Sequence, residues 1–315
     1  MRVVVAGASG VIGRPLVSAV REAGHEVIGL VHSRRGGEAA RSAGATQVVV
    51  VDVLDREALL GAVGGMRAEV VVHELTGYRN APPTRYRGAG VRRTNLLRTT
   101  GTTHLLDLAA RVGAKRFVTQ SLILGYGLIN HGTAPITEDR PFGVLRGHPS
   151  DPSISAIKQA EELAFAAPDL DAIALRYGIF YGAEASAVFI AMLRRMMLPL
   201  PREGTGQVGW VHLDDAVRAT VAAIEHGRPG RAYNIVDDEP VAWDVMLAAM
   251  AAAAGARRPV RLPSWLIRSG APFAATQMLD MSMRVANSSA REDLGWRPAI
   301  PSYREGLGRP DAVAE

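Results

Sequence analysis

The feature that most constrains the fold is the alternation of Val-rich runs with amphipathic segments over the first half of the chain. The runs are continuously apolar, which is typical of strands buried on both faces. The segments between them have helical spacing, and this strand–helix–strand rhythm predicts a parallel sheet covered by helices on both faces. The predicted strands are residues 2–7, 25–31, 46–52, 69–75, 115–121 and 171–178.

A GxxGxxG pattern lies between the first predicted strand and the first predicted helix. Gly7 permits the tight turn, Gly10 lets the backbone approach a pyrophosphate, and Gly13 permits close packing of helix on strand. The helix N-terminus adds N–H groups and a positive dipole for the phosphates. We therefore predict a Rossmann-like, doubly wound α/β fold that binds a dinucleotide. The predicted contacts in this turn are Gly7, Ser9, Gly10, Val11, Ile12 and Gly13.

The segment after the second strand favours NADPH over NADH. NAD-specific proteins usually place an acid here for the ribose 2′-hydroxyl, but this chain has His32, Ser33, Arg34 and Arg35. These donors suit a 2′-phosphate, which an acid would repel; a solvated basic loop is the alternative interpretation. Asp52 ends the third strand and can accept a hydrogen bond from the adenine amine. The remaining cofactor contacts predicted along the strand ends are Val53, Leu75, Thr76 and Tyr177.

Composition excludes several other classes of protein. No apolar run approaches ~20 residues, so a membrane span is not expected. The chain contains no cysteine, and its 36 basic residues are scattered among 31 acidic ones with a net charge of +5. A nucleic-acid-binding protein concentrates its positive charge on one face, so we expect no nucleic-acid partner. The sequence enters a strand directly without the apolar core of a signal peptide, which predicts a cytoplasmic protein.

The strand–helix rhythm changes near residue 182, and we predict three parts of the chain. Residues 1–182 form the dinucleotide-binding core, and 183–308 form a smaller, mainly substrate-binding lobe with strands that return to the core. Residues 309–315 are expected to be a disordered tail. Met-rich segments at 189–197 and 272–283 suit a flat apolar ligand, because methionine adapts to irregular surfaces; core packing is an equally good interpretation.

Several segments, in this order, resemble the extended short-chain dehydrogenase/reductase family, which includes sugar-nucleotide epimerases and dehydratases. Besides the glycine turn they are VVHELTG, GTTHLLDLAARVGAKRFV, ITEDRPF, LRYGIFYGAE, VGWVHLDDAVRAT, AYNIVDD and SSAREDLGWRP. The resemblance implies a Ser or Thr after the fifth strand, followed by Tyr-x-x-x-Lys on a helix. Ser121 matches the first position within one residue, Lys158 matches the lysine, and Ile154 stands in place of the tyrosine. Arg98 stands at the spacing of the family's usual asparagine.

In the family, the tyrosine protonates the substrate oxygen and the lysine binds the nicotinamide ribose. Without the tyrosine, the proton has three possible sources: another side chain, water, or a hydroxyl of the substrate itself. The third source favours aromatic polyketides, and the chain resembles ketoreductases of antibiotic pathways that lack the tyrosine and act on angucyclinones. We therefore expect an NADPH-dependent ketoreductase in which Ser121 and Lys158 serve the active site. The candidate replacement donors are Tyr126, Tyr181, Ser121 and His131.

Two other functions remain open at this point. A regulator that binds NADPH and catalyses nothing would also have lost the tyrosine, and a sugar-nucleotide epimerase or dehydratase shares the fold. Asp214 and Asp215 are adjacent, but the resemblance assigns them to a structural turn, so no metal is expected. The resemblance also makes a homodimer possible.

Overall fold

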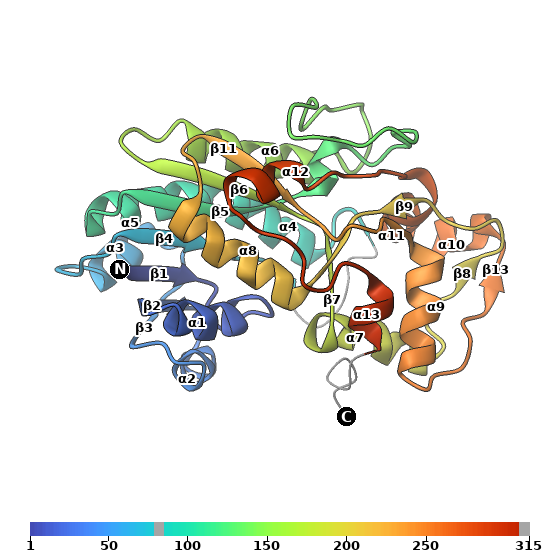
Figure 1. Ribbon diagram of the computed structural model, residues 1–315, viewed down its shortest axis with the longest axis horizontal. Coiled ribbons are helices and arrows are strands. Elements are labelled where there is room, and N and C mark those ends of the chain that lie inside the picture. Colours follow the sequence, from blue (N-terminus) through green and yellow to red (C-terminus); the bar gives the residue numbers. More distant parts are fainter. Residues whose placement is uncertain (79–84, 309–315) are drawn as a thin grey trace.

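The computed structural model describes residues 1–78 and 85–308. Its centre is a seven-stranded sheet with the order β11-β6-β5-β4-β1-β2-β3, in which every neighbouring pair is parallel (Figure 1). The strands are β1 (Arg2–Ala6), β2 (Glu26–Val31), β3 (Gln47–Val50), β4 (Val70–His73), β5 (Arg116–Leu122), β6 (Asp171–Tyr177) and β11 (Arg231–Ile235). The predicted doubly wound α/β fold is confirmed.

Helices cover both faces of this sheet because successive strand residues point to opposite sides. In β1, Val3 and Val5 pack beneath one helical layer, and Val4 and Ala6 pack beneath the other. The first layer contains α1 (Gly13–Glu22), α2 (Arg34–Ser42) and α8 (Leu213–His226). The second contains α3 (Arg56–Ala62), α5 (Thr102–Val112) and α6 (Asp151–Phe165).

Two irregular helices interrupt this regular pattern. A π-helical segment, η1 (Leu97–Gly101), joins α4 (Ala89–Leu96) to α5, and a 3₁₀ turn, η2 (Ile123–Tyr126), follows β5 directly. π-Helical turns are rare and are frequent at functional sites. Within the described residues, no helix is both long and apolar enough to cross a membrane.

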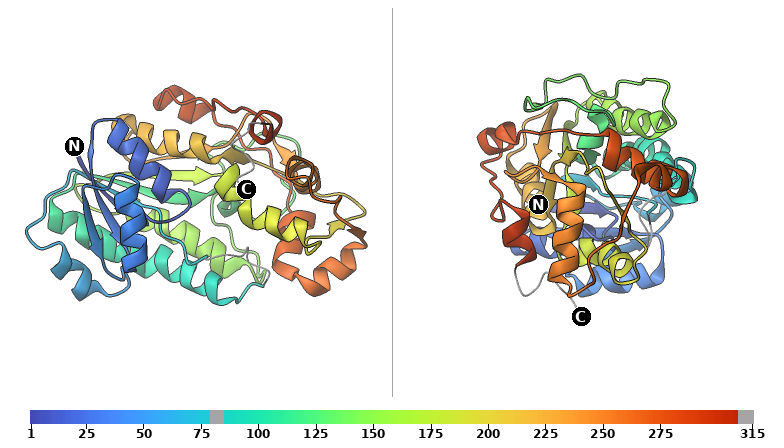
Figure 2. Two further views of the ribbon diagram at one scale, coloured as in Figure 1. Left: turned by 90° about the horizontal axis from the view of Figure 1, so that it is seen from below. Right: turned by 90° about the vertical axis from the view of Figure 1, so that its right-hand side faces the viewer.

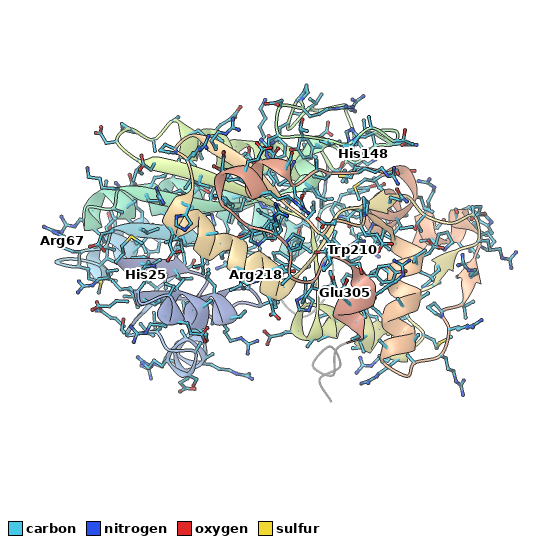
Figure 3. All side chains as sticks on the ribbon, viewed as in Figure 1. His25, Arg67, His148, Trp210, Arg218 and Glu305 are labelled. Carbon is cyan, nitrogen blue, oxygen red and sulfur yellow. The ribbon has the colours of Figure 1, made fainter. Side chains whose placement is uncertain are left out.

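The second half of the chain builds a lobe beyond the carboxyl ends of the strands, at the opposite end of the molecule from the N-terminus (Figure 2). Trp210 lies toward this lobe, and Arg67 lies at the far end of the sheet (Figure 3). The lobe has its own apolar core around Trp210, Trp243 and five buried methionines. Its elements, with the closing segments, are β7 (Ile179–Tyr181), α7 (Ala183–Arg194), β8 (Leu200–Pro201), β9 (Gln207–Val208), β10 (Trp210–His212), β12 (Val241–Ala242), α9 (Trp243–Ala253), β13 (Arg261–Leu262), α10 (Ser264–Gly270), α11 (Pro272–Ala275), η3 (Thr276–Asp280), α12 (Ser288–Asp293) and α13 (Tyr303–Leu307).

The chain passes back and forth between the lobe and the sheet. β11 returns from the C-terminal half to become an edge strand of the main sheet, and α8 packs beside α1. Residues 183–308 therefore do not form an independent domain. The predicted tail at 309–315 lies outside the described residues.

Candidate active site

The turn between β1 and α1 has the geometry that phosphate binding requires. Gly7 has a φ of +94°, and the Gly10 N–H donates to the Gly7 carbonyl over 2.8 Å. A Cβ on Gly13 would lie 2.0 Å from the same carbonyl oxygen, so only glycine lets α1 begin this close to β1. The turn therefore fits the pyrophosphate of a dinucleotide. Of the other predicted residues of the turn, Ser9 is half-buried, Val11 is exposed and Ile12 is buried.

The residues after β2 form a positively charged helix N-terminus. The Ser33 hydroxyl accepts a hydrogen bond from the Gly36 N–H over 3.2 Å and so caps α2. His32, Arg34 and Arg35 are exposed beside this cap. Both the helix dipole and the guanidinium groups favour an anion here, in keeping with a 2′-phosphate. The choice between NAD and NADP stays a prediction.

Asp52 follows β3 and is already engaged by neighbouring donors. Its Oδ1 accepts from the Leu54 N–H over 3.1 Å, and its Oδ2 lies 3.0 Å from Arg93 Nη2. Burial opposes ionisation, but the hydrogen bonds from Leu54 and Arg93 outweigh it and lower the pKa of Asp52. Its contact with adenine stays a prediction. Of three other predicted contacts, Val53 is buried, Leu75 is half-buried and Thr76 is exposed.

The structure corrects the predicted cofactor contact of Tyr177. This residue is 1% exposed; its hydroxyl donates to Glu74 Oε1 over 2.9 Å and lies 2.7 Å from Thr220 Oγ1 on α8. β6 turns the side chain into the core beneath α8, and Tyr177 is not among the residues that line the cavity described below. Burial raises the pKa of Glu74 to about 8, so this carboxyl holds a proton at neutral pH.

A cavity of about 540 Å³ lies where β5 and α6 meet the lobe. It is at the carboxyl ends of the parallel strands, where open α/β sheets bind their ligands. Both Met-rich segments singled out in the sequence contribute to its wall. The apolar lining includes Leu122, Leu124, Ile154, Ile157, Phe189, Met192, Trp243, Phe273 and Met278. Among the residues that the structure describes, the polar lining consists of Tyr78, Arg98, Ser153 and Gln277.

Ser121 does not face this cavity, contrary to expectation. It is 2% exposed, and its hydroxyl donates to Glu161 Oε1 over 2.5 Å. Glu161 in turn pairs with Arg176 through two bonds of 2.9 and 2.7 Å. The reason is the two-residue period of a strand: Leu122 points into the cavity, and Ser121 points toward α6. Ser121 therefore belongs to a buried structural network.

Lys158 also lies outside the cavity. Its side chain is 46% exposed, and its ammonium group lies 3.6 Å from Glu162. Its stem packs against the backbone of Gly143, where an added Cβ would lie 2.5 Å from it. Successive helix residues are rotated by about 100°, so Ile157 faces the cavity and its neighbour Lys158 does not.

The family's Tyr-x-x-x-Lys pattern was aligned on Lys158, but the residue of α6 that faces the cavity is Ile157, one position earlier. Ser153 and Ile157 form the i, i+4 pair that lines the cavity, with Ile154 beside them. Helix α6 contains no tyrosine and only one lysine, which is the exposed Lys158. The cavity-facing side of α6 thus offers a single hydroxyl, that of Ser153, and no cation.

The suggested replacement proton donors are also engaged elsewhere. Tyr126 donates to Asn234 over 2.8 Å and accepts from Arg176 over 2.9 Å. Tyr181 donates to Asp237 over 2.7 Å, and the His131 ring lies 3.1 Å from the Gly127 carbonyl oxygen. None of these three side chains lines the cavity.

Two lining residues were missed as candidates from the sequence. Tyr78 lies five residues beyond the end of β4, the edge where ligand-binding loops begin. Arg98 was noted only for replacing an asparagine; in the structure it lies in η1, is 3% exposed and lines the cavity. The loop position of Tyr78 and the unusual residue type at Arg98 were the available signals.

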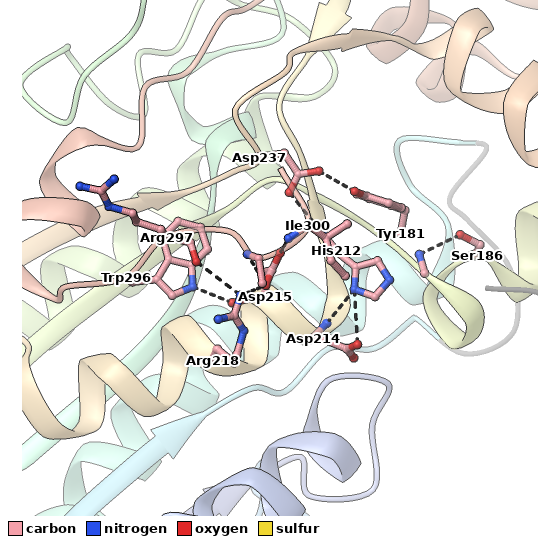
Figure 4. A network of polar contacts seen from close by, with 12 residues as sticks. Tyr181, Ser186, His212, Asp214, Asp215, Arg218, Asp237, Trp296, Arg297 and Ile300 are labelled. Atoms are coloured by element: carbon pink, nitrogen blue, oxygen red, sulfur yellow. Dashed lines mark hydrogen bonds and ion pairs between the residues drawn. The ribbon is translucent and has the colours of Figure 1, made fainter. Parts of the chain in front are cut away.

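Asp215 holds the C-terminal segment in place through buried hydrogen bonds. Its buried carboxylate accepts from the backbone N–H groups of Ala299 and Ile300 over 3.1 and 2.9 Å, and the Trp296 indole donates to its carbonyl over 3.0 Å (Figure 4). These bonds hold the C-terminal segment against α8. Within the described residues, no group of three or more His, Asp or Glu side chains is arranged to hold a metal.

The chain belongs to the NAD-dependent epimerase/dehydratase family, whose sequence model matches residues 3–236. Members of this family depend on a nicotinamide dinucleotide. The family assignment agrees with the glycine turn, the sheet order and the position of the cavity.

The relatives divide into a similar reductase and more distant sugar-nucleotide enzymes. A 3-diazoavenalumate denitrifying reductase from Streptomyces sp. is 40% identical over 98% of this chain and 100% of its own length. A dTDP-glucose 4,6-dehydratase from Streptomyces griseus is 32% identical over 50% of this chain and 48% of its own.

Solved structures support the fold. The UDP-glucose 4-epimerase of Thermotoga maritima has a TM-score of 0.78 at 23% identity, covering 98% of this chain and 96% of that one. A dTDP-glucose 4,6-dehydratase of Streptomyces venezuelae, solved with NAD, has the same TM-score and identity and covers 98% and 95%.

Proposed function

We propose that this protein is an NADPH-dependent reductase that replaces the diazo group of an aromatic compound with hydrogen. One observation carries the proposal: the cavity is apolar, and its α6 wall presents Ser153 and Ile157 where a ketone reduction needs an acid and a cation. The full-length similarity to a denitrifying reductase supports the substrate class.

The glycine turn and the basic residues after β2 would hold the cofactor. Gly7, Gly10 and Gly13 fit its pyrophosphate, and Arg34 with Arg35 suits a 2′-phosphate. When bound, the nicotinamide supplies a hydride. The apolar wall formed by Leu122, Ile157 and other residues excludes water and holds a flat aromatic ring, as such cavities generally do.

Removal of a diazo group needs no proton from the protein. In the net reaction of an aryl diazonium ion, the carbon–nitrogen bond breaks, N₂ leaves and a carbon–hydrogen bond forms, while one hydride supplies both electrons and the hydrogen. The charge of the diazonium ion is neutralised by that hydride. A cavity wall without an acid on α6 is therefore sufficient for this reaction, and the loss of the tyrosine has no cost in rate.

A second candidate is reduction of an aromatic polyketide ketone, as the sequence suggested. It is favoured by Tyr78, whose phenol borders the same cavity. Reduction of a ketone places negative charge on oxygen, and general acid help there is worth ~10²–10⁴ in rate. Tyr78 is the one tyrosine among the lining residues and so the natural donor for this reaction.

One experiment separates the two reactions. NADPH and NADH consumption are followed with 3-diazo-4-hydroxycinnamate and with a set of hydroxylated aromatic ketones, for wild type and Tyr78→Phe. We expect turnover of the diazo compound, release of N₂ and transfer of deuterium from labelled NADPH to the former diazo carbon, with little effect of Tyr78→Phe. Turnover of ketones that collapses in Tyr78→Phe would support the second candidate instead. Tight cofactor binding without any turnover would support a regulator.

A further inference from the structure

Arg98 is a buried cation for which the described protein provides no counterion. It is 3% exposed, and its Nε has no hydrogen-bond partner within the described residues. No ion pair to Arg98 is found in that part of the chain, although 17 other pairs are. Burial also lowers the pKa of this guanidinium.

The groups around Arg98 do not offer a negative charge. His73, whose ring lies 3.3 Å from the carbonyl oxygen of the neighbouring Leu97, has its pKa lowered to about 4 by burial and is neutral. Tyr78 borders the same cavity and lies close enough to act on Arg98 electrostatically. Within the described residues, the guanidinium therefore faces an apolar cavity whose other polar lining side chains are two hydroxyls and an amide, those of Tyr78, Ser153 and Gln277.

A buried unpaired charge is strongly unfavourable, and natural proteins pair such groups or use them to bind something. Arginine presents a planar set of donors that matches a carboxylate through two parallel bonds. The cofactor phosphates are placed at the glycine turn at the start of α1, whereas Arg98 lines the substrate cavity. The missing partner is thus expected on the substrate.

We infer that Arg98 binds a carboxylate of the substrate, so that the cavity selects aromatic acids over their neutral esters or amides. This inference rests on the proposed function, since it names the charged group of the same aromatic substrate. The π-helical turn η1 is what presents the Arg98 side chain between α4 and α5, at the cavity wall. Arg98 sets specificity and orientation and takes no part in bond making.

The test measures binding without turnover. Isothermal titration calorimetry compares 4-hydroxycinnamate with its methyl ester, in the presence of NADP⁺, for wild type, Arg98→Met, Arg98→Lys and Arg92→Met. Arg92 is an exposed arginine on α4, so its variant removes the same charge outside the cavity. The melting temperature of each variant shows whether it is folded.

We expect wild type and Arg92→Met to bind the acid about 10- to 100-fold tighter than the ester, the range of a charge-assisted hydrogen bond. Arg98→Met should lose this preference while its affinity for the ester changes little, and Arg98→Lys should keep part of it. The inference is overturned if wild type does not prefer the acid, or if Arg98→Met weakens acid and ester equally.

Turnover of 3-diazo-4-hydroxycinnamate and its methyl ester separates this inference from the proposed function. Absence of diazo reduction, with an Arg98-dependent preference for the acid in binding, would remove the proposed reaction and leave the carboxylate site. Reduction of acid and ester at equal kcat/KM by wild type and Arg98→Met would support the proposed reaction and overturn the carboxylate site.

Discussion

Replacing Lys158 with alanine tests the placement of α6 most directly. A lysine that binds the nicotinamide ribose contributes at least one charge-assisted hydrogen bond, worth about 1.5–3 kcal/mol, and its loss lowers kcat/KM by ~10- to 150-fold. In the structure, the ammonium group is instead 3.6 Å from Glu162, and both side chains are about half exposed. We therefore expect almost no effect on catalysis.

The magnitude follows from that exposure. An exposed ion pair at i, i+4 on a helix contributes ~0.3–0.5 kcal/mol, and alanine recovers part of this through its helix propensity. With an unfolding entropy of ~2.1 cal/mol/K per residue, the melting temperature should change by less than ~1 °C. The value of kcat/KM for NADPH and for substrate should stay within about two-fold of wild type.

The assay is steady-state NADPH oxidation at varied cofactor and varied substrate, combined with thermal unfolding. Lys115→Ala is the matched control, because Lys115 is the other lysine of the chain and is exposed before β5. A ten-fold or larger rise in KM for NADPH in Lys158→Ala, absent from Lys115→Ala, would refute the placement of α6 in the structure and restore the lysine to the cofactor site.

Four further variants probe buried polar groups. Ser121→Ala should keep kcat and lose about 1.5–3 kcal/mol of stability with its hydrogen bond to the Glu161 carboxylate. Glu161→Gln should lose about 3–5 kcal/mol because it leaves the Arg176 guanidinium buried without its charge partner. Urea unfolding measures both losses, and a loss of kcat in Ser121→Ala would contradict the structural role. Arg98→Met should raise the melting temperature, since it removes a buried cation without a counterion in the described protein; a lower melting temperature in calorimetry would mean that Arg98 has a structural partner. Burial raises the pKa of Glu74 from 4.5 to about 8. Between these two pH values the folded state holds a proton that the unfolded state releases. The free energy of unfolding therefore falls as pH rises through this window, by up to ~1.4 kcal/mol per pH unit. Glu74→Gln should remove that part of the slope between pH 5.5 and 7.5 in urea unfolding, and an unchanged slope would show that Glu74 is ionised in the folded state.

Features that depend on neighbouring residues were predictable from the sequence alone. Gly10 and Gly13 make their close contacts with Gly7 inside the turn, and continuous Val-rich runs are typical of strands buried on both faces, so the order of residues predicts both features. The resemblance of further segments to the extended short-chain dehydrogenase/reductase family extended the prediction of the fold to the whole sheet. Both interpretations of the Met-rich segments hold in part: Met192 and Met278 line the cavity, whereas Met281 and Met283 are buried in the core of the lobe.

The identity of the cavity-facing residues depended on the tertiary structure. A shift of one residue turns a strand side chain to the opposite face and rotates a helix side chain by about 100°. This is the difference between Leu122 and Ser121, and between Ile157 and Lys158. Ser and Ile occur equally well in a core and in a cavity wall, so the pattern of residue types did not settle the alignment.

Arg98 shows most clearly what the sequence by itself left undetermined. The resemblance indicates that an arginine stands at the spacing of the family's usual asparagine. Whether its charge is paired depends on segments far apart in the chain, since Arg98 meets Tyr78, Ser153 and Gln277 around one cavity only after the lobe has closed over the sheet. The energy of a buried charge is set by its three-dimensional surroundings, and these exist only in the folded protein.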